Sequence, residues 1–432
     1  MILLMATILS IGAHPTEGAR GRDALANPPT VAPLDGGKPL LSHVTVTAMG
    51  FGPGEIIYAG GRYIIPQHDQ LAASPYYVAG SVFLISHDDG AHWSSHVSTT
   101  NLQAVVSVRA EPWLNHAAPP PDFTALSIAV DPANPAIIYE AGGSCDVTCQ
   151  MPLQGHSVIR STDGGRTWEN ALAYSQPLLA APTAATIQTN IVKTPALVTA
   201  VLMHGPPVEA SGLVFDPRDH QRVLVCVSGL GVLSTTNGAR TWTYVAQPGQ
   251  QRSTCEVAFD PHNARTIYRL DRRGFLYRST DSGQHWSRRS SLGNQSNGVG
   301  NSLMTSLTPV GQAVYVVVGS GLQESLDGGA HFRCVLATPG HGGTLVAAIR
   351  GSGGWIGAAA AAPAAGLQGM YLARDGGSWR LGAATDRIGS QSALDLQGMY
   401  GSLMDRMWED HATHVVFTTG TVGGLYRWES SL

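Results

Sequence analysis

Charge is scarce in this sequence of 432 residues, and lysine is nearly absent. Charged residues make up 13% of the chain, the formal net charge is −4, and Lys38 and Lys193 are the only lysines. Because the chain has no basic run, it lacks the electrostatic feature by which proteins bind nucleic acids or acidic membrane surfaces. The composition therefore argues against both classes of partner.

Long apolar runs are missing as well. The apolar stretch at the N-terminus, within MILLMATILSIGAHPTEGARGRD, is too short to span a bilayer, and nothing else is long enough. It resembles the apolar region of a signal peptide, with Ala13 as a candidate cleavage point, although no Lys or Arg precedes it. We expect residues 1–24 to be a signal-like or disordered segment, with a buried N-terminal strand as the alternative. We accordingly expect a secreted or cell-surface protein without an integral membrane segment.

Cysteine is sparse, with five residues in the whole chain. Cys145 and Cys149 lie close enough in one loop to form a disulfide, which would suit an exported protein. No second Cys or His pair has the spacing of a zinc site, so we expect neither a metal nor another cofactor. Cys226 and Cys255 lie in strand-like runs and are expected to be small buried residues, whereas Cys334 has no assigned role.

A repeated turn is what the chain contains in abundance. The stretch 157-SVIRSTDGGRTWEN-170 recurs with variations in which Ser or Thr is followed by Asp or Asn, then Gly, then an aromatic residue. The copies lie about 45 residues apart, or about 75 where an insert of about 30 intervenes, and this period suggests propeller blades. We call each copy a Ser-Asp turn and expect its residues to be structural: Ser86, Asp88, Trp93, Ser161, Asp163, Trp168, Asn237, Trp242, Ser279, Asp281, Trp286, Ser325, Asp327, Phe332, Asp375 and Trp379.

Each Ser-Asp turn has a physical basis. The preceding run is β-branched or aromatic and has the length of a strand. The Asp or Asn side chain accepts local backbone N–H groups, and Gly tolerates a positive φ, so the chain can reverse. The aromatic residue after the turn is expected to pack back onto its own blade.

A second repeated element completes the blade. Segments such as 128-IAVDPANPAIIYEAGG-143 and 257-VAFDPHNARTIYRLD-271 indicate a strand, an Asp-Pro turn and a second strand. With the Ser-Asp turn between the third and fourth strands, this gives a four-stranded blade with strands A to D. Seven blades are predicted, beginning near residues 43, 125, 211, 255, 304, 343 and 393, with 403–414 read as an A-to-B turn.

The last blade ends after three strands, and we expect the segment near residues 25–42 to supply its fourth strand. Such pairing would remove an open sheet edge. The sequence thus predicts an all-β fold in which residues 25–432 form a single seven-bladed β-propeller, with six blades as the fallback.

The Ser-Asp turns resemble the Asp-box, or BNR, repeat of sialidases. Their combination with Asp-Pro turns is similar to sortilin-type propellers, photosystem II assembly-factor propellers and xyloglucan-cleaving endoglucanase propellers. The resemblance runs from about residue 43 to the end and implies the fold, but these relatives differ in activity. A sialidase would also need three converging arginines, a Tyr–Glu nucleophile pair and an Asp acid. The segment 62-RYIIP-66 departs from the Tyr-Arg-Ile-Pro-like strand of sialidases, and no Tyr–Glu pair can be placed from the sequence.

The inserts point to one face of the predicted propeller. D-to-A and B-to-C connections open on the same face, and the longest of them belong to blades 1, 2 and 6: 61–80, 97–124, 141–156, 171–210 and 351–368. Long connections are uncommon without a binding or lid role. We therefore expect a pocket on this face, walled by loops.

Candidate site residues come from these connections. In 107-SVRAEPWLNHAAPPPDF-123 a Trp could stack on a sugar while acids bond its hydroxyls; the alternative is a Pro-stiffened surface loop that the Trp anchors. The catalytic residues are unknown, and the candidates are Glu111, Asp122, His116 and Asp69. The ligand-binding candidates are Arg109, Trp113, His68, Tyr76, Tyr77, Glu209, Asp386 and Arg387.

The sequence is compatible with three functions. The first, which we favour, is an exported binding or assembly module for a glycan or protein ligand, and we expect it to be a monomer. The second is a carbohydrate-active enzyme, either a hydrolase with two carboxylates or a lyase with a His or Tyr base. The third and least favoured is a sialidase. Whether the protein is an enzyme stays uncertain from the sequence.

Overall fold

The structure of the chain is a computed structural model, which describes the chain in separate stretches. The described residues are 31–35, 40–41, 44–66, 76–99, 114–115, 123–144, 155–174, 210–227, 231–245, 255–260, 263–271, 274–292, 307–310, 313–318, 321–337, 344–351, 354–360, 369–373, 380–384, 407–410, 413–419 and 425–430.

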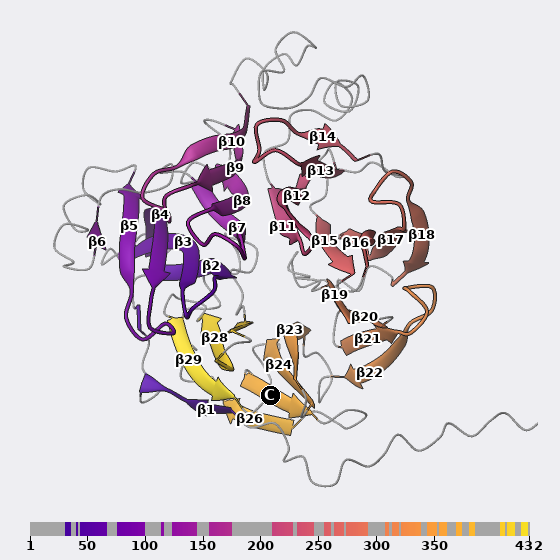
Figure 1. Ribbon diagram of the computed structural model, residues 1–432. Coiled ribbons are helices and arrows are strands. Elements are labelled where there is room, and N and C mark those ends of the chain that lie inside the picture. Colours follow the sequence, from indigo (N-terminus) through magenta and orange to yellow (C-terminus); the bar gives the residue numbers. More distant parts are fainter. Residues whose placement is uncertain are drawn as a thin grey trace, which may run out of the picture.

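These residues form seven β-sheets that follow one another around a ring in chain order (Figure 1). All strand pairings are antiparallel except that of β5 with β6, and no described residue lies in an α-helix. The first strands of neighbouring sheets contact one another along much of the ring and lie nearest its centre. The all-β class expected from the sequence is confirmed.

We number the sheets by their order along the chain. The first contains β2 (Val44–Phe51), β3 (Ile57–Pro66), β4 (Tyr76–Ser86), β5 (Ser94–Thr99) and β6 (Leu114–Asn115). The second contains β7 (Phe123–Val130), β8 (Ile138–Ser144), β9 (Gly155–Ser161) and β10 (Glu169–Tyr174). The third contains β11 (Ala210–Asp216), β12 (Asp219–Val227), β13 (Gly231–Thr235) and β14 (Thr243–Tyr244).

The remaining four sheets repeat this order. The fourth contains β15 (Cys255–Asp260), β16 (Asn263–Asp271), β17 (Phe275–Ser279) and β18 (Ser287–Ser291). The fifth contains β19 (Leu307–Val310), β20 (Ala313–Val318), β21 (Gly321–Ser325) and β22 (Arg333–Ala337). The sixth contains β23 (Thr344–Gly351), β24 (Gly354–Ala360), β25 (Gly369–Ala373) and β26 (Arg380–Ala384). The seventh contains β27 (Met407–Asp410), β28 (Val415–Thr419), β29 (Leu425–Ser430) and β1 (Val31–Pro33).

The strand β1 joins the two ends of the chain. It pairs with β29 in antiparallel register, with Ala32 opposite Glu429. Farther along, the Leu34 N–H donates to the Arg427 carbonyl at 3.0 Å and the Leu40 N–H donates to the Leu425 carbonyl at 2.8 Å. The outer edge of β29 is therefore paired by an N-terminal segment.

The packing between sheets explains the apolar pattern of the strands. In β12, residues 223–227 read Val-Leu-Val-Cys-Val, and all five are fully buried. Val223, Val225 and Val227 pack in a cluster with the second sheet, whereas Leu224 and Cys226 pack with the fourth. Because a neighbour covers each face, the strand is continuously apolar rather than alternating.

The Ser-Asp turn of the second sheet shows how these turns are held. The Ser161 Oγ donates to the Asp163 Oδ1 at 2.8 Å and accepts the Gly165 N–H at 2.8 Å. The two oxygens of Asp163 accept the backbone N–H and the hydroxyl of Thr167, at 2.9 and 2.6 Å. Partial burial by itself would raise the pKa of Asp163, but these bonds favour the carboxylate and lower its pKa to about 2. The turn is a small, locally satisfied unit.

Four other described turns repeat this geometry. The serines or threonine at 86, 235, 279 and 325 each donate to the Asp or Asn two residues on. In three copies a histidine takes the place of Thr167, with its Nδ1 at 2.6 Å from the Asp Oδ2; these are His92, His285 and His331. The copy with Asp375 and Trp379 lies outside the described residues.

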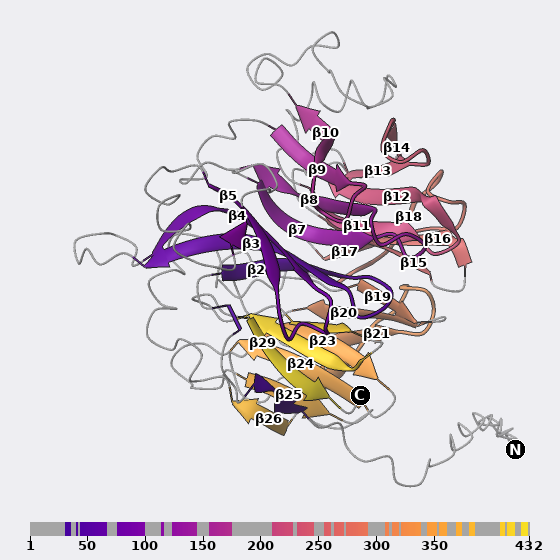
Figure 2. The same cartoon turned by 60° about the vertical axis from the view of Figure 1, so that its left-hand side comes forward.

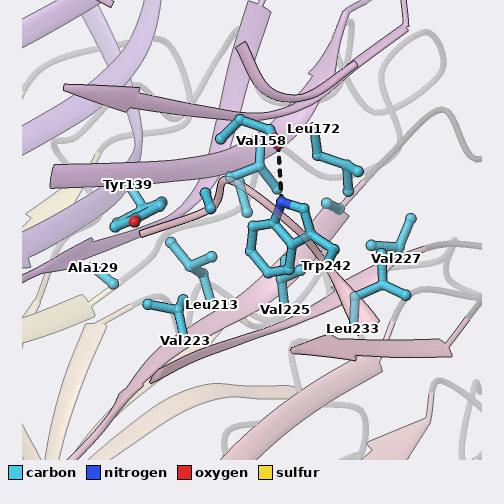
Figure 3. Close-up of a cluster of buried hydrophobic side chains, with 14 residues drawn as sticks. Ala129, Tyr139, Val158, Leu172, Leu213, Val223, Val225, Val227, Leu233 and Trp242 are labelled. Carbon is cyan, nitrogen blue, oxygen red and sulfur yellow. Dashed lines mark hydrogen bonds between the residues drawn. The ribbon is translucent and has the colours of Figure 1, made fainter. Parts of the chain in front are cut away.

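The aromatic residue of each described turn lies in a cluster with residues of its own sheet, as expected, and also with residues of the preceding sheet, which the sequence did not indicate. The Trp168 ring meets Phe83 of the first sheet edge-on, with ring centroids 4.9 Å apart. The Trp93 ring meets Phe417 of the seventh sheet in the same way. In the third sheet Trp242 is fully buried, and its Nε1 donates to the Ala171 carbonyl of the second sheet at 2.9 Å (Figure 3). The turns therefore join one sheet to the next.

Arginine side chains strengthen these joints. The Arg427 Nη1 donates to the Asp89 carbonyl in the next turn at 3.1 Å, and the Arg222 Nη2 donates to the Ser282 carbonyl at 2.9 Å. The Arg289 Nε donates to the Gly328 carbonyl at 3.3 Å. A guanidinium presents several N–H groups in a fixed plane, whereas an ammonium is a single flexible donor. Arginine is therefore better suited than lysine to bond these carbonyls, and the chain contains many arginines but two lysines.

Candidate functional site

The two ends of the ring differ in their connections. The Ser-Asp turns lie at one end, which we call the turn end. At the other end the second strand of each sheet leads to the third, and the last strand leads to the next sheet. The connections there include 100–113 and 116–122 around β6, and 175–209 between the second and third sheets. We call this the long-connection end, and it is the candidate site.

A hairpin of the first sheet projects at the long-connection end. The pairing of β2 with β3 ends at Val44 and Tyr63, and the pairing of β4 with β5 ends at Gly80 and Thr99. Beyond these points the described residues of β3 and β4 continue to pair with each other, as far as Pro66 and Tyr76. Figure 2 shows these two long strands extending past β2. At about 3.3 Å per residue, the free part reaches on the order of 10 Å beyond its neighbours.

We call this free part the hairpin tip and define it as residues 64–66 and 76–78. Its sequence is Ile-Ile-Pro on β3 and Tyr-Tyr-Val on β4, with no charged residue. The backbone pairs Ile65 with Tyr77 and Pro66 with Tyr76. Both tyrosines were predicted ligand residues, and they are the members of that set that lie within the described residues.

The other predicted catalytic and ligand-binding residues lie outside the described residues: His68, Asp69, Arg109, Glu111, Trp113, His116, Asp122, Glu209, Asp386 and Arg387. A part of the 107–123 run is described, namely β6 (Leu114–Asn115). It pairs in parallel with β5, so that Ser95 lies opposite Leu114 and His96 opposite Asn115. The strand β6 therefore lies at the outer edge of the first sheet. A pocket at the centre of the ring would instead be lined by the first strand of each sheet.

A Tyr–Glu pair does exist, although none could be placed from the sequence. The Tyr315 hydroxyl donates to the Glu324 Oε1 at 2.8 Å, and the Arg333 Nη2 donates to the Glu324 Oε2 at 2.7 Å. The same register positions hold Tyr139 with Arg160 in the second sheet, where the guanidinium lies 5.7 Å from the ring centroid. The pair thus occupies a repeated inter-strand position, which favours a structural role over a nucleophile.

A disulfide connects the third and fourth sheets at the long-connection end. It joins Cys226 near the end of β12 to Cys255 at the start of β15, with the Cα atoms 5.7 Å apart. Both residues are buried, as expected, but nothing in the sequence indicated that they pair. The predicted pair Cys145 and Cys149 lies outside the described residues. Cys334 is exposed and free.

One buried acid went unnoticed in the sequence. Glu140 on β8 is 1% exposed, and its Oε1 has no hydrogen-bond partner. Burial raises the pKa of this carboxyl to about 8. The signal was available, since Glu140 interrupts the apolar strand Ile-Ile-Tyr-Glu-Ala-Gly-Gly at a position that a neighbouring sheet must cover.

The described residues lack two kinds of feature. Among them, no three His, Cys, Asp or Glu side chains gather closely enough to hold a metal ion. None of the described segments is a helix with the length and apolar character needed to cross a membrane.

Comparison with known proteins gives structural similarity at low sequence identity. No protein-family model and no curated protein sequence matches the chain. A structure of YCF48 bound to D1 peptide is 14% identical, covering 93% of this chain and 97% of that chain, with a TM-score of 0.49. YCF48 from Cyanidioschyzon merolae is 13% identical, covering 93% and 99%, with a TM-score of 0.48. The GH74 enzyme of Niastella koreensis is 16% identical, covering 90% of this chain and 60% of the enzyme, with a TM-score of 0.39. Similarity at this level carries no argument about activity or partners.

Proposed function

We propose that the chain is a seven-bladed β-propeller with Asp-box turns that acts as a binding or assembly module. Its ligand surface is the long-connection end over the first, second and sixth sheets. The observation that carries this proposal is the hairpin tip, which continues the first sheet beyond its neighbours. A loop position on a rigid scaffold is where binding residues concentrate in folded proteins.

The composition of the hairpin tip supports a binding role. Tyr76 and Tyr77 combine a large apolar ring with a hydroxyl, and tyrosine is enriched where proteins contact ligands and partners. The paired backbone of β3 and β4 fixes both residues before a ligand arrives, which reduces the ordering cost of binding. The ligand is a glycan or a protein segment, and the protein acts as a monomer.

The disulfide between Cys226 and Cys255 supports export. Structural disulfides persist in oxidising compartments and are rare where thiols are kept reduced. This pair is buried between two sheets, so it is shielded from reductants. We therefore place the module outside the cytoplasm, at the cell surface or secreted.

The proposal is tested by screening the purified chain against glycan and peptide arrays, with a polysaccharide depolymerisation assay on the same protein. A Tyr76→Ser/Tyr77→Ser variant is expected to lose at least tenfold in affinity for any ligand found. Leu326→Ser is the control, because Leu326 is an exposed apolar residue (53%) at the turn end. Binding that is unchanged in the tyrosine variant but lost in the Leu326 variant would move the ligand surface to the turn end and refute the proposal.

The depolymerisation assay addresses catalysis. Product formation that disappears in a Glu111→Ala/Asp122→Ala variant would replace the binding module by a carbohydrate-active enzyme with two loop carboxylates. Binding without turnover, retained in that double variant, is the result expected of the module.

A further inference from the structure

We propose that Glu140 is the sensor of a pH-dependent joint between the first and second sheets, closed while its carboxyl is protonated and loosened when the proton leaves. This inference goes beyond the binding function, since it concerns how two of the sheets that carry the proposed ligand surface are held together. It would make that surface responsive to pH near neutrality.

The geometry places the carboxyl inside the joint. Glu140 pairs with Ile128 on β7 and with Ile159 on β9, and both of these residues belong to the cluster between the two sheets. Opposite them, β3 contributes Gly60. A Cβ at Gly60 would lie 2.9 Å from the Glu140 Oε1 and 2.6 Å from the Cβ of Ala125. The carboxyl and Ala125 thus fill the space that a side chain on β3 would need.

Among the described residues, no donor bonds one of the two carboxyl oxygens of Glu140. The Glu140 Oε1 is buried and has no hydrogen-bond partner. The hydroxyl of Thr47 on β2 is a nearby donor, but it already donates to the Ala125 carbonyl at 2.6 Å. An ionised carboxylate without a donor is far more costly to bury than the neutral acid. Deprotonation therefore favours an arrangement in which water reaches the group.

Few of the described side chains that accompany Glu140 in this joint are titratable. On β3, Tyr58 has a pKa raised further by burial, so it stays neutral throughout the range of interest. The strands β2 and β7 contain no titratable residue. On β9, Arg160 lies over the Tyr139 ring, which packs towards the third sheet. Arg62 lies two residues beyond Gly60 on β3, and its side chain lies outside the described part of the chain.

The sign of the effect follows from the two pKa values. The carboxyl has a pKa of 4.5 when exposed and about 8 in the closed joint, so closing takes up a proton between these values. The joint is fully stable below pH 4.5 and loses stability as the pH rises towards 8. Its opening equilibrium should increase roughly tenfold to a hundredfold between pH 6 and pH 8.5.

Hydrogen exchange of the full chain tests this at pH 6 and pH 8.5, after correction for the intrinsic exchange rates. Amides of β3, β7 and β8 should lose at least tenfold in protection at the higher pH, while those of β15 and β16 should not. Glu140→Gln should abolish the difference. Glu169→Gln is the matched control on the same sheet, because Glu169 is exposed and pairs with Arg160; it should behave as wild type.

Several results would overturn the proposal. The first is equal protection of β3, β7 and β8 at both pH values in the wild-type chain. The second is an unchanged pH dependence in Glu140→Gln. An Arg62→Gln variant should keep the pH dependence of the wild-type chain. If this variant lost the pH dependence, an ion pair with Arg62 would be its cause instead. If Glu140→Gln does not fold, urea unfolding of the wild-type chain decides the question. The urea concentration at the midpoint should be lower at pH 8.5 than at pH 6, and an equal midpoint at both pH values refutes the sensor.

Discussion

Replacing Trp242 with alanine is expected to lower the free energy of unfolding by about 3–5 kcal/mol, the range found for large aromatic residues deleted from a core. The indole is fully buried among residues of the second and third sheets, and its N–H donates to the Ala171 carbonyl. Its removal leaves both a cavity at the joint and a buried carbonyl without this donor. Urea unfolding followed by circular dichroism measures the change.

The matched control is Trp168→Ala. Trp168 holds the same position in its own turn, but it is only partly buried, and its Nε1 donates to the Gly165 carbonyl within that turn. Its loss should cost clearly less than that of Trp242. Equal destabilisation by the two variants would contradict the view that Trp242 owes its effect to the joint with the second sheet.

A glycine pair in one turn is expected to give the second large difference. Gly164 and Gly165 both have positive φ, 73° and 87°, so alanine is strained at either position. A Cβ at Gly164 would meet nothing within 4 Å, whereas one at Gly165 would overlap the Phe83 ring of the first sheet. Gly164→Ala should therefore cost about 1 kcal/mol, and Gly165→Ala about 2 kcal/mol more through overpacking.

Thermal and urea unfolding of the two single variants provide the comparison. If the two variants lose the same free energy of unfolding, Gly165 does not pack closely against Phe83. The contact between this turn and the first sheet would then be wrong. A Phe83→Leu background should reduce the difference between the two alanine variants, because a smaller side chain leaves more room for the added methyl group.

The repeat was readable from the sequence because its signals are local. A Ser, an Asp two residues on and a Gly four residues on make contacts with one another, as Ser161, Asp163 and Gly165 do. This spacing does not depend on how the sheets are arranged, so it can be recognised in the sequence. The direction in which the aromatic residue packs is not local, since it depends on which sheet lies beside the turn. The sequence therefore predicted the turn but not the contact of Trp168 with Phe83 of the first sheet.

Contacts between sheets were the hardest to predict. Cys226 and Cys255 are 29 residues apart, and they meet only because β12 and β15 lie side by side in neighbouring sheets. The segment 403–414 was predicted to be a turn, but it contains β27, which pairs with β28. Its acidic and basic residues are typical of a turn, so the sequence did not indicate a strand there. Most of the predicted site residues lie outside the described residues, so their roles stay predictions.

We propose that the chain closes into one ring; this closure brings the first sheet and its hairpin tip beside the sixth and seventh sheets. The decisive measurement is cross-linking of β1 to β29. In a Cys334→Ser background, Ala32→Cys/Glu429→Cys places two thiols on directly opposed residues. Opposed Cα atoms in antiparallel strands lie about 4.5–5.5 Å apart, within the range of a disulfide.

Mild oxidation of the folded chain, followed by peptide mass analysis, should yield the linked pair in high yield. The control Ala32→Cys/Ser287→Cys, with its second cysteine on the exposed outer strand of the fourth sheet, should stay reduced. Closure predicts that the first pair becomes linked when the folded chain is oxidised but not when oxidation is carried out in denaturant. A yield no higher than that of the control would mean that β1 does not complete the seventh sheet, and the ring would be open.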